Sequence, residues 1–151
     1  MANRNKTKPT RQQRGVSATE LALILPLFVT IVLGCVDFGR FAYTYIAVSN
    51  AARAGASWGM MNPPIVADQT PWENSVTQAA INEMSQQPGF QSSNLTVTVP
   101  PITTEAGTGT WRFTVTASYP FQTIITWNVG GYGIPHSLNL QQQVTMRGIR
   151  P

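Results

Sequence analysis

The fold of this chain is decided by the stretch Arg14-Gly15-Val16-Ser17-Ala18-Thr19-Glu20, which joins a basic leader to a long apolar run. No acidic residue precedes Glu20. The leader holds five of the ten basic residues, namely Arg4, Lys6, Lys8, Arg11 and Arg14. Without those five charges the formal net charge falls from +4 to −1. The basic character therefore belongs to the leader, and the remainder has no charge excess with which to bind nucleic acid.

The apolar run after the leader has the length of a membrane span. Residues 21–36 are 16 residues without a charge, and at about 1.5 Å per residue they reach roughly 24 Å. A bilayer core is about 30 Å thick, and the 21 residues that begin at Val16 reach roughly 31 Å. We therefore expect a transmembrane helix over residues 16–36, with Glu20 just inside its edge and a kink at Pro26. The span is expected to contain Leu21, Leu23, Leu25, Pro26, Leu27, Phe28 and Val36.

Glu20 needs a partner, because an acid near the centre of a membrane helix costs about 2.5 to 3.5 kcal/mol and less near the edge. A cut between Gly15 and Val16 would create an ammonium group four residues before Glu20, and residues four apart share a helix face. That amine could pair with Glu20 of the same chain or of a neighbouring subunit. An uncut Glu20 could instead reach the headgroups beside Arg14. The charges alone leave both interpretations open.

The basic residues also predict the orientation of the span. Five Lys and Arg residues lie just before it, and only Asp37 and Arg40 follow closely. Short segments rich in Lys and Arg stay in the cytoplasm. We expect a cytoplasmic N-terminus and an exterior part that covers residues 37–151.

The helix is expected to continue beyond the membrane to about residue 58. Gly59 and then Pro63-Pro64 supply the stop. An apolar stripe of heptad spacing runs along this segment, and it consists of Phe38, Phe41, Tyr45, Val48 and Ala52. The stripe could pack on the chain's own exterior part or on another subunit. Small residues on the same helix, among them Gly39 and those of residues 51–56, would let another helix approach closely.

The remainder predicts a small α+β unit of about three antiparallel strands. Helical spacing of apolar residues favours a second helix over residues 71–87, which Pro88-Gly89 ends. Alternation predicts strands over residues 95–99 and 111–119, and a third over 138–146. The expected divisions are residues 1–15 as leader, 16–36 as span, 37–60 as helix extension and 61–151 as exterior domain. The fold class is thus α+β.

The chemical inventory is too small for an enzyme. His136 is the single histidine and Cys35 the single cysteine, so no His/Cys metal cluster and no internal disulfide can form. We expect no catalytic residue, no metal and no cofactor. Cys35 leaves one alternative open, because Val32-Leu33-Gly34-Cys35 could serve as a lipoprotein signal acylated at Cys35. An ordinary single-pass periplasmic anchor is the other alternative.

One segment resembles a known family. A glycine followed after four residues by Glu20, ahead of an apolar helix, resembles the cleavage signal of type IV prepilins. Over residues 14–27, then Asp37-Phe38-Gly39-Arg40, then Asn50-Ala51-Ala52-Arg53-Ala54-Gly55-Ala56, the chain resembles the TadE-like family. It departs from the family pattern at Leu21, where an aromatic residue is common, and at Asp37, where Glu is common.

The resemblance implies a minor pseudopilin of the tight-adherence (Tad, type IVb) pilus machinery, acting in cell adhesion or secretion. A prepilin peptidase would cut between Gly15 and Val16, and Glu20 would act in assembly and register. The implied partners are this peptidase, other Tad pseudopilins, a major pilin, the inner-membrane assembly platform and membrane lipid. The implied location is the bacterial inner membrane, with a single pass and a periplasmic C-terminal domain.

Overall fold

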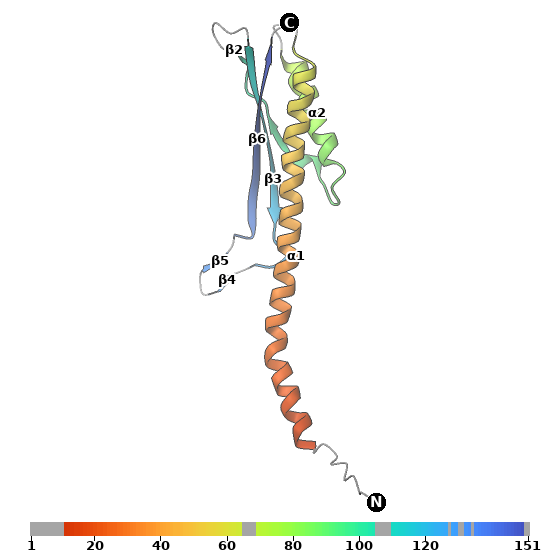
Figure 1. The fold of residues 1–151 in the computed structure, drawn as a ribbon, viewed down its shortest axis with the longest axis vertical. Coiled ribbons are helices and arrows are strands. Elements are labelled where there is room, and N and C mark those ends of the chain that lie inside the picture. The colour runs from red at the N-terminus through yellow and green to blue at the C-terminus, as the bar shows by residue number, and fades with distance from the viewer. Residues whose placement is uncertain are drawn as a thin grey trace, which may run out of the picture. The chain divides into compact units, whose positions relative to one another are not determined.

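The chain has an α+β fold, as predicted (Figure 1). The computed structural model describes residues 11–64, 69–104, 110–126, 128–129, 132–133 and 135–149. The chain divides into two units, residues 1–38 and residues 39–151. The helices and strands are α1 (Arg11–Met61), α2 (Thr70–Met84), a short 3-10 turn (Ser92–Asn94), β1 (Thr96–Thr98), β2 (Thr103–Thr104), β3 (Thr110–Gln122), β4 (Asn128–Val129), β5 (Tyr132–Gly133) and β6 (Ser137–Ile149).

The first unit contains the apolar part of α1. Among the described residues, one helix segment, Gly15–Met61, is long and apolar enough to cross a membrane by length and composition. Pro26 lies inside the helix, where it removes one backbone hydrogen bond. The hydroxyl of Thr30 donates to the Pro26 carbonyl at 2.8 Å. A hydroxyl bonded in this way to the preceding turn often bends a helix further.

The second unit is built around the long strand β3. β6 pairs with β3 antiparallel over thirteen consecutive residue pairs, from Thr110↔Ile149 to Gln122↔Ser137. On the other side of β3, β2 pairs with its beginning and β1 pairs with its middle. The result is a sheet three strands wide. A separate two-residue ribbon joins β4 to β5.

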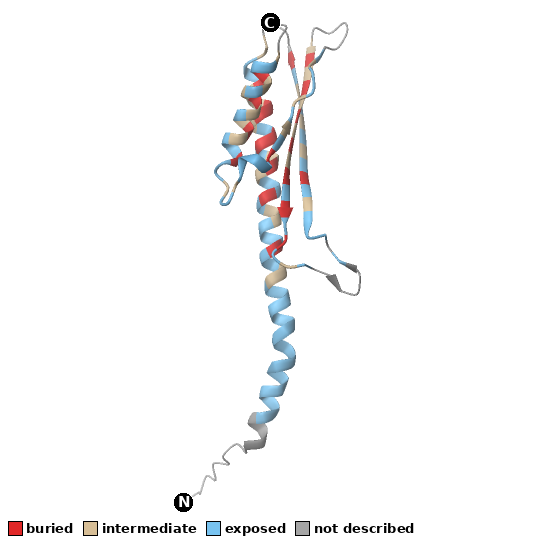
Figure 2. Cartoon of the chain, turned by 180° about the vertical axis from the view of Figure 1, so that it is seen from behind, coloured by how far each residue is buried: buried red, intermediate tan, exposed pale blue. Residues whose placement is uncertain are grey.

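One face of this sheet forms the core with α1 and α2 (Figure 2). Along β3, residues alternate between buried and partly exposed, because successive side chains of a strand point to opposite faces. One part of the core gathers around Val48, Ala80 and Leu140. The other is aromatic, since the ring of Phe113 stacks on Trp111 at 5.1 Å and meets Trp72 edge-on at 5.3 Å between centroids.

The predicted elements are present, with shifted ends. The second helix ends at Met84, three residues earlier than predicted, and its buried residues are Trp72, Val76, Ala80 and Met84. β6 is longer than predicted at both ends, and β3 begins at Thr110 and continues past Tyr119 to Gln122. The β4–β5 ribbon was not predicted, because its glycines indicated turns alone.

The extension of β3 passes through Pro120, at which the predicted strand stops. The backbone nitrogen of Thr123 donates to the His136 carbonyl at 3.0 Å, so these opposed residues form a hydrogen-bonded pair. Such pairs alternate along an antiparallel ladder, and the backbone groups of Pro120 therefore point away from β6. β1 pairs only with residues 116–118 of β3. Proline is tolerated where no strand needs its missing N–H.

The glycines of α1 offer a test of this packing. A Cβ added at Gly59 would lie 2.9 Å from the Phe113 ring and 3.0 Å from Trp72, whereas one added at Gly39 meets nothing within 4 Å. We predict that Gly59→Ala lowers the free energy of unfolding by about 1 to 3 kcal/mol through overpacking. Gly39→Ala should leave it unchanged or raise it by up to about 1 kcal/mol, since alanine favours helix. Thermal unfolding of the full chain in detergent measures both, and equal effects would contradict the packing of Gly59.

Candidate processing and assembly site

The Gly15–Val16 bond lies inside the first turns of α1. The hydroxyl of Thr19 donates to the carbonyls of both Gly15 and Val16, at 2.9 Å each. The first of these carbonyls belongs to the peptide bond at which cleavage is predicted. A Cβ added at Gly15 would meet no atom within 4 Å. Nothing in the described chain therefore requires glycine at this position, and a requirement for it would have to come from a second molecule.

Thr19 was not singled out from the sequence. The available signal was a hydroxyl residue four positions after Gly15, which is the spacing that lets a threonine bond the carbonyl one turn back. The contact shows that the predicted cleavage bond is held in helical conformation by a side chain as well as by the backbone.

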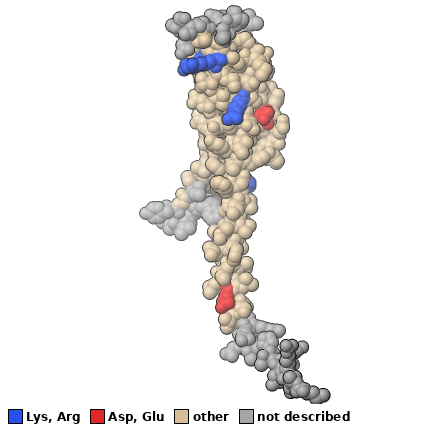
Figure 3. Space-filling model, viewed as in Figure 1, with Lys and Arg blue, Asp and Glu red and all other residues tan. Residues whose placement is uncertain are grey.

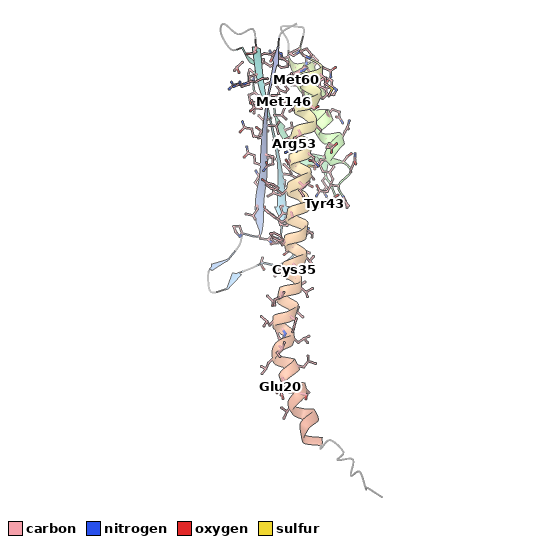
Figure 4. All side chains as sticks on the ribbon, viewed as in Figure 1. Glu20, Cys35, Tyr43, Arg53, Met60 and Met146 are labelled. Carbon is pink, nitrogen blue, oxygen red and sulfur yellow. The ribbon has the colours of Figure 1, made fainter. Side chains whose placement is uncertain are left out.

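Glu20 lies one helical turn after Val16, and both residues are exposed. Figure 4 shows the Glu20 side chain projecting from the helix. Residues at this spacing are neighbours on a helix surface. The structure thus brings the backbone nitrogen that cleavage would free and the Glu20 carboxylate onto one side of the helix. The role of Glu20 in assembly stays a prediction.

The residues predicted for the span are exposed in the single chain. Figure 3 shows how sparse charged side chains are on the face in view. An apolar surface of this extent marks a contact with lipid or protein. The large apolar residues exposed here include Leu21 at 63%, Leu23 at 81%, Leu25 at 54%, Leu27 at 61%, Phe28 at 61% and Val36 at 45%. Their place in a membrane stays a prediction.

The predicted heptad stripe has two kinds of environment. Val48 and Ala52 are fully buried in the core, and Phe41 is partly buried, with its ring edge-on to Phe121 at 5.6 Å. Phe38 and Tyr45 are exposed, at 71% and 44%. Some members of the stripe therefore pack in the chain's own core, and the others have side chains exposed for contact with another molecule. Packing of its exposed members on another subunit is still a prediction.

The small residues of the 50–56 segment pack inside the chain. Ala51, Ala52 and Ala56 are fully buried, and a Cβ added at Gly55 would come within 3.2 Å of the Val76 carbonyl and 3.4 Å of Val115. The helix that approaches them closely is α2 of the same chain. The repeat of small residues at 51, 52, 55 and 56 was the signal for one buried helix face.

Arg40 joins α1 to the end of β3, which sequence reasoning did not foresee. Its guanidinium lies over the Phe121 ring at 5.6 Å, and Nη1 donates to the Gln122 carbonyl at 3.4 Å. Cation–ring contacts at exposed sites stabilise by about 0.5 to 1 kcal/mol. Asp37 is also buried, with 5% exposure.

The other chemically active side chains are dispersed. The hydroxyl of Thr123 lies 3.2 Å from Nδ1 of His136, and Cys35 is exposed on α1 (Figure 4). Within the described residues no group of three or more His, Cys, Asp or Glu side chains could hold a metal ion.

Comparison with known proteins adds one match. Residues 15–57 match the family model described as TadE-like protein. None of the curated proteins and none of the solved structures matches the chain. The match begins at the predicted cleavage site and ends in the buried small-residue segment of α1. The resemblance inferred from the sequence is thus confirmed over residues 15–57, which are similar to the TadE-like family.

Proposed function

We propose that the chain is a minor pseudopilin of a tight-adherence pilus assembly or related secretion system. The observation that carries this proposal is the exposed apolar part of α1, which begins directly after Gly15 and Glu20 and lies within the family match. In this proposal residues 16–36 cross the bacterial inner membrane and residues 37–151 lie in the periplasm. The partners are the prepilin peptidase, related pseudopilins, a major pilin and the assembly platform.

The peptidase step uses two properties of Gly15. Its exposed backbone carries no side chain that would obstruct an approaching enzyme. Glycine also favours a helix by about 1 kcal/mol less than alanine does, so the turn that Thr19 holds opens more readily at this position. Cleavage would leave residues 1–15 in the cytoplasm and a new ammonium group on Val16.

The assembly step uses the charge that cleavage creates. The Val16 ammonium and the Glu20 carboxylate would neutralise each other where lipid penalises both. When the helix leaves lipid to join others, a pair of this kind favours one register, because any other leaves a charge without a partner. The pair can form within one chain or between neighbouring chains. A pair between neighbouring chains would fix their register, whereas a pair within one chain would only neutralise the two charges in lipid.

Processing is tested by the intact mass and N-terminal residue of the protein purified from membranes that contain the cognate peptidase. We predict a chain that begins at Val16, and predict that Gly15→Leu leaves the chain uncut yet inserted. Gly39→Leu is the matched control, because a Cβ at that glycine also meets nothing within 4 Å. A chain that begins at a lipid-modified Cys35 would instead establish a lipoprotein, and an uncut wild type would establish an ordinary anchor.

The role of Glu20 is tested by Glu20→Ala. This variant should insert and be cut normally but join the assembled fraction about tenfold less, which corresponds to the loss of roughly 1.4 kcal/mol. Glu20→Asp should retain part of the activity, because it keeps the charge. Glu83→Ala, which removes an exposed acid on α2, is the control for net charge. Immunoblots of membrane and sheared-surface fractions provide the measurement, and normal assembly of Glu20→Ala would refute the register mechanism.

A further inference from the structure

The outer edge of β6 is a long row of backbone hydrogen-bonding groups. β6 lies at one edge of the sheet in both views (Figure 1 and Figure 2). Among the described residues, β3 is the strand with which it pairs, and that pairing covers all thirteen residues without interruption. Every second residue of β6 therefore directs its backbone N–H and carbonyl groups away from β3.

Two hydrogen bonds fix which residues point outward. Thr123 donates its backbone N–H to His136, so even-numbered residues of β6 bond with β3. The hydroxyl of Thr103 in β2 donates to the Arg112 carbonyl at 3.4 Å, so the backbone groups of Arg112 point away from β6. Arg147 lies opposite Arg112, and its backbone groups therefore point away from β3. Both contacts indicate that the odd-numbered residues of β6 direct their backbone groups outward. The outward backbone groups belong to Ser137, Asn139, Gln141, Gln143, Thr145, Arg147 and Ile149.

This edge lacks the devices that usually protect an edge strand. Soluble proteins interrupt such edges with proline, lysine, a bulge or a short strand length. β6 contains neither proline nor lysine, its register with β3 has no bulge, and its length is well above the usual five to six residues or so. Four of the residues whose backbone groups point outward have exposed, uncharged side chains, namely Asn139, Gln141, Gln143 and Thr145. An edge of this kind readily accepts another strand.

The side chains beside the edge define the strand that fits. Toward the core, Leu138, Leu140 and Val144 are buried or partly buried, so an added strand needs apolar residues on that face. On the outer face the one charge of the β6 edge is Arg147, which is directly opposite Arg112. Like charges opposite each other on a sheet destabilise it. An acid placed next to Arg147 would relieve that repulsion.

A second copy of this chain fits poorly. In parallel alignment the second copy would be turned over about its strand axis. Its polar odd-numbered residues would then lie on the core face beside Leu138, Leu140 and Val144, where apolar residues are needed. In antiparallel register the two copies would run in opposite directions. β6 runs in the same direction as residues 39–61 of α1 (Figure 1), so the helices would also be opposed. Under the proposed function, two chains anchored through α1 in one membrane cannot be arranged in this way.

We propose that the outer edge of β6 binds an extended segment of a different protein. This segment adds to the sheet as the strand next to β6, alternates apolar with polar residues and places an acidic side chain beside Arg147. The contact is separate from the apolar surface of α1, and its chemistry depends on the edge rather than on cleavage at Gly15.

The probe is a synthetic peptide of the length of β6, in which valine alternates with threonine and glutamates lie near both ends. Its outer backbone edge is N-methylated to prevent self-pairing. Amide hydrogen exchange of the full chain in detergent, read by NMR, should show fast exchange at Gln141, Gln143 and Thr145 and slow exchange at Gln142 and Val144. Saturating peptide should slow exchange at the three odd-numbered positions.

Two variants separate the backbone edge from the side chains. Gln143→Pro removes an outward N–H without touching the bonds to β3, and it should weaken peptide binding by about tenfold or more while thermal unfolding stays unchanged. Gln143→Ala keeps the N–H and should bind within about threefold of wild type. Arg147→Glu should reverse the preference between the glutamate peptide and a lysine counterpart, and Arg53→Glu on α1 should not.

Three results would overturn the proposal. Slow exchange at the odd-numbered amides without peptide at every dilution would mean that the chain covers its own edge. Slow exchange that appears only as protein concentration rises would mean that a second copy is the occupant. Unchanged exchange at millimolar peptide would mean that the edge binds no strand. None of these results bears on processing at Gly15, so the proposed function is judged separately.

Discussion

The second unit of the chain, residues 39–151, depends on the close approach of α1 to β3 and α2. Ala51, Ala52 and Ala56 are fully buried, and Gly55 and Gly59 leave no room for a larger side chain. The aromatic residues Trp111 and Phe113 of β3 belong to the same buried cluster as Ala56. The small residues therefore set the spacing that the sheet, α2 and the aromatic cluster all share.

That packing lets a single helix serve two environments. The apolar residues before Val36 are exposed on all sides of α1, while from Val48 onward the small and apolar residues are buried on one side. Burial of apolar surface stabilises by about 25 cal/mol per Å², which favours lipid around the first segment and a sheet beside the second. The family match covers both segments. The matched segment is thus a helix with an exposed apolar part and a buried part, and the whole sheet lies outside it.

The sequence predicted those features that periodicity controls. The apolar run, the α+β class, the second helix and the strands β1, β3 and β6 all follow from spacing of 3.6 or 2 residues. It missed features that depend on distant contacts. The continuation of β3 through Pro120 is one of them, because a proline stops a strand only where a neighbouring strand needs its N–H. The contact of Arg40 with Gln122 likewise arises from chain segments far apart in sequence. The small residues of the 51–56 segment were expected to let another helix approach closely, and α2 of the same chain does so.

The glycines separate the requirements of folding from those of partners. Gly55, Gly59 and Gly148 lie where an added Cβ would crowd or strike Val76, Phe113 or Trp111, so the fold itself excludes larger residues there. Gly15 and Gly39 have open space around the same position, and both lie on a helix, where glycine costs about 1 kcal/mol relative to alanine. Neither glycine has a packing reason among the described residues. Under the proposed function, the reason at Gly15 is a peptidase that must reach the backbone. The open space at Gly39, at the border between the two units of the chain, is where a neighbouring helix could approach α1 most closely.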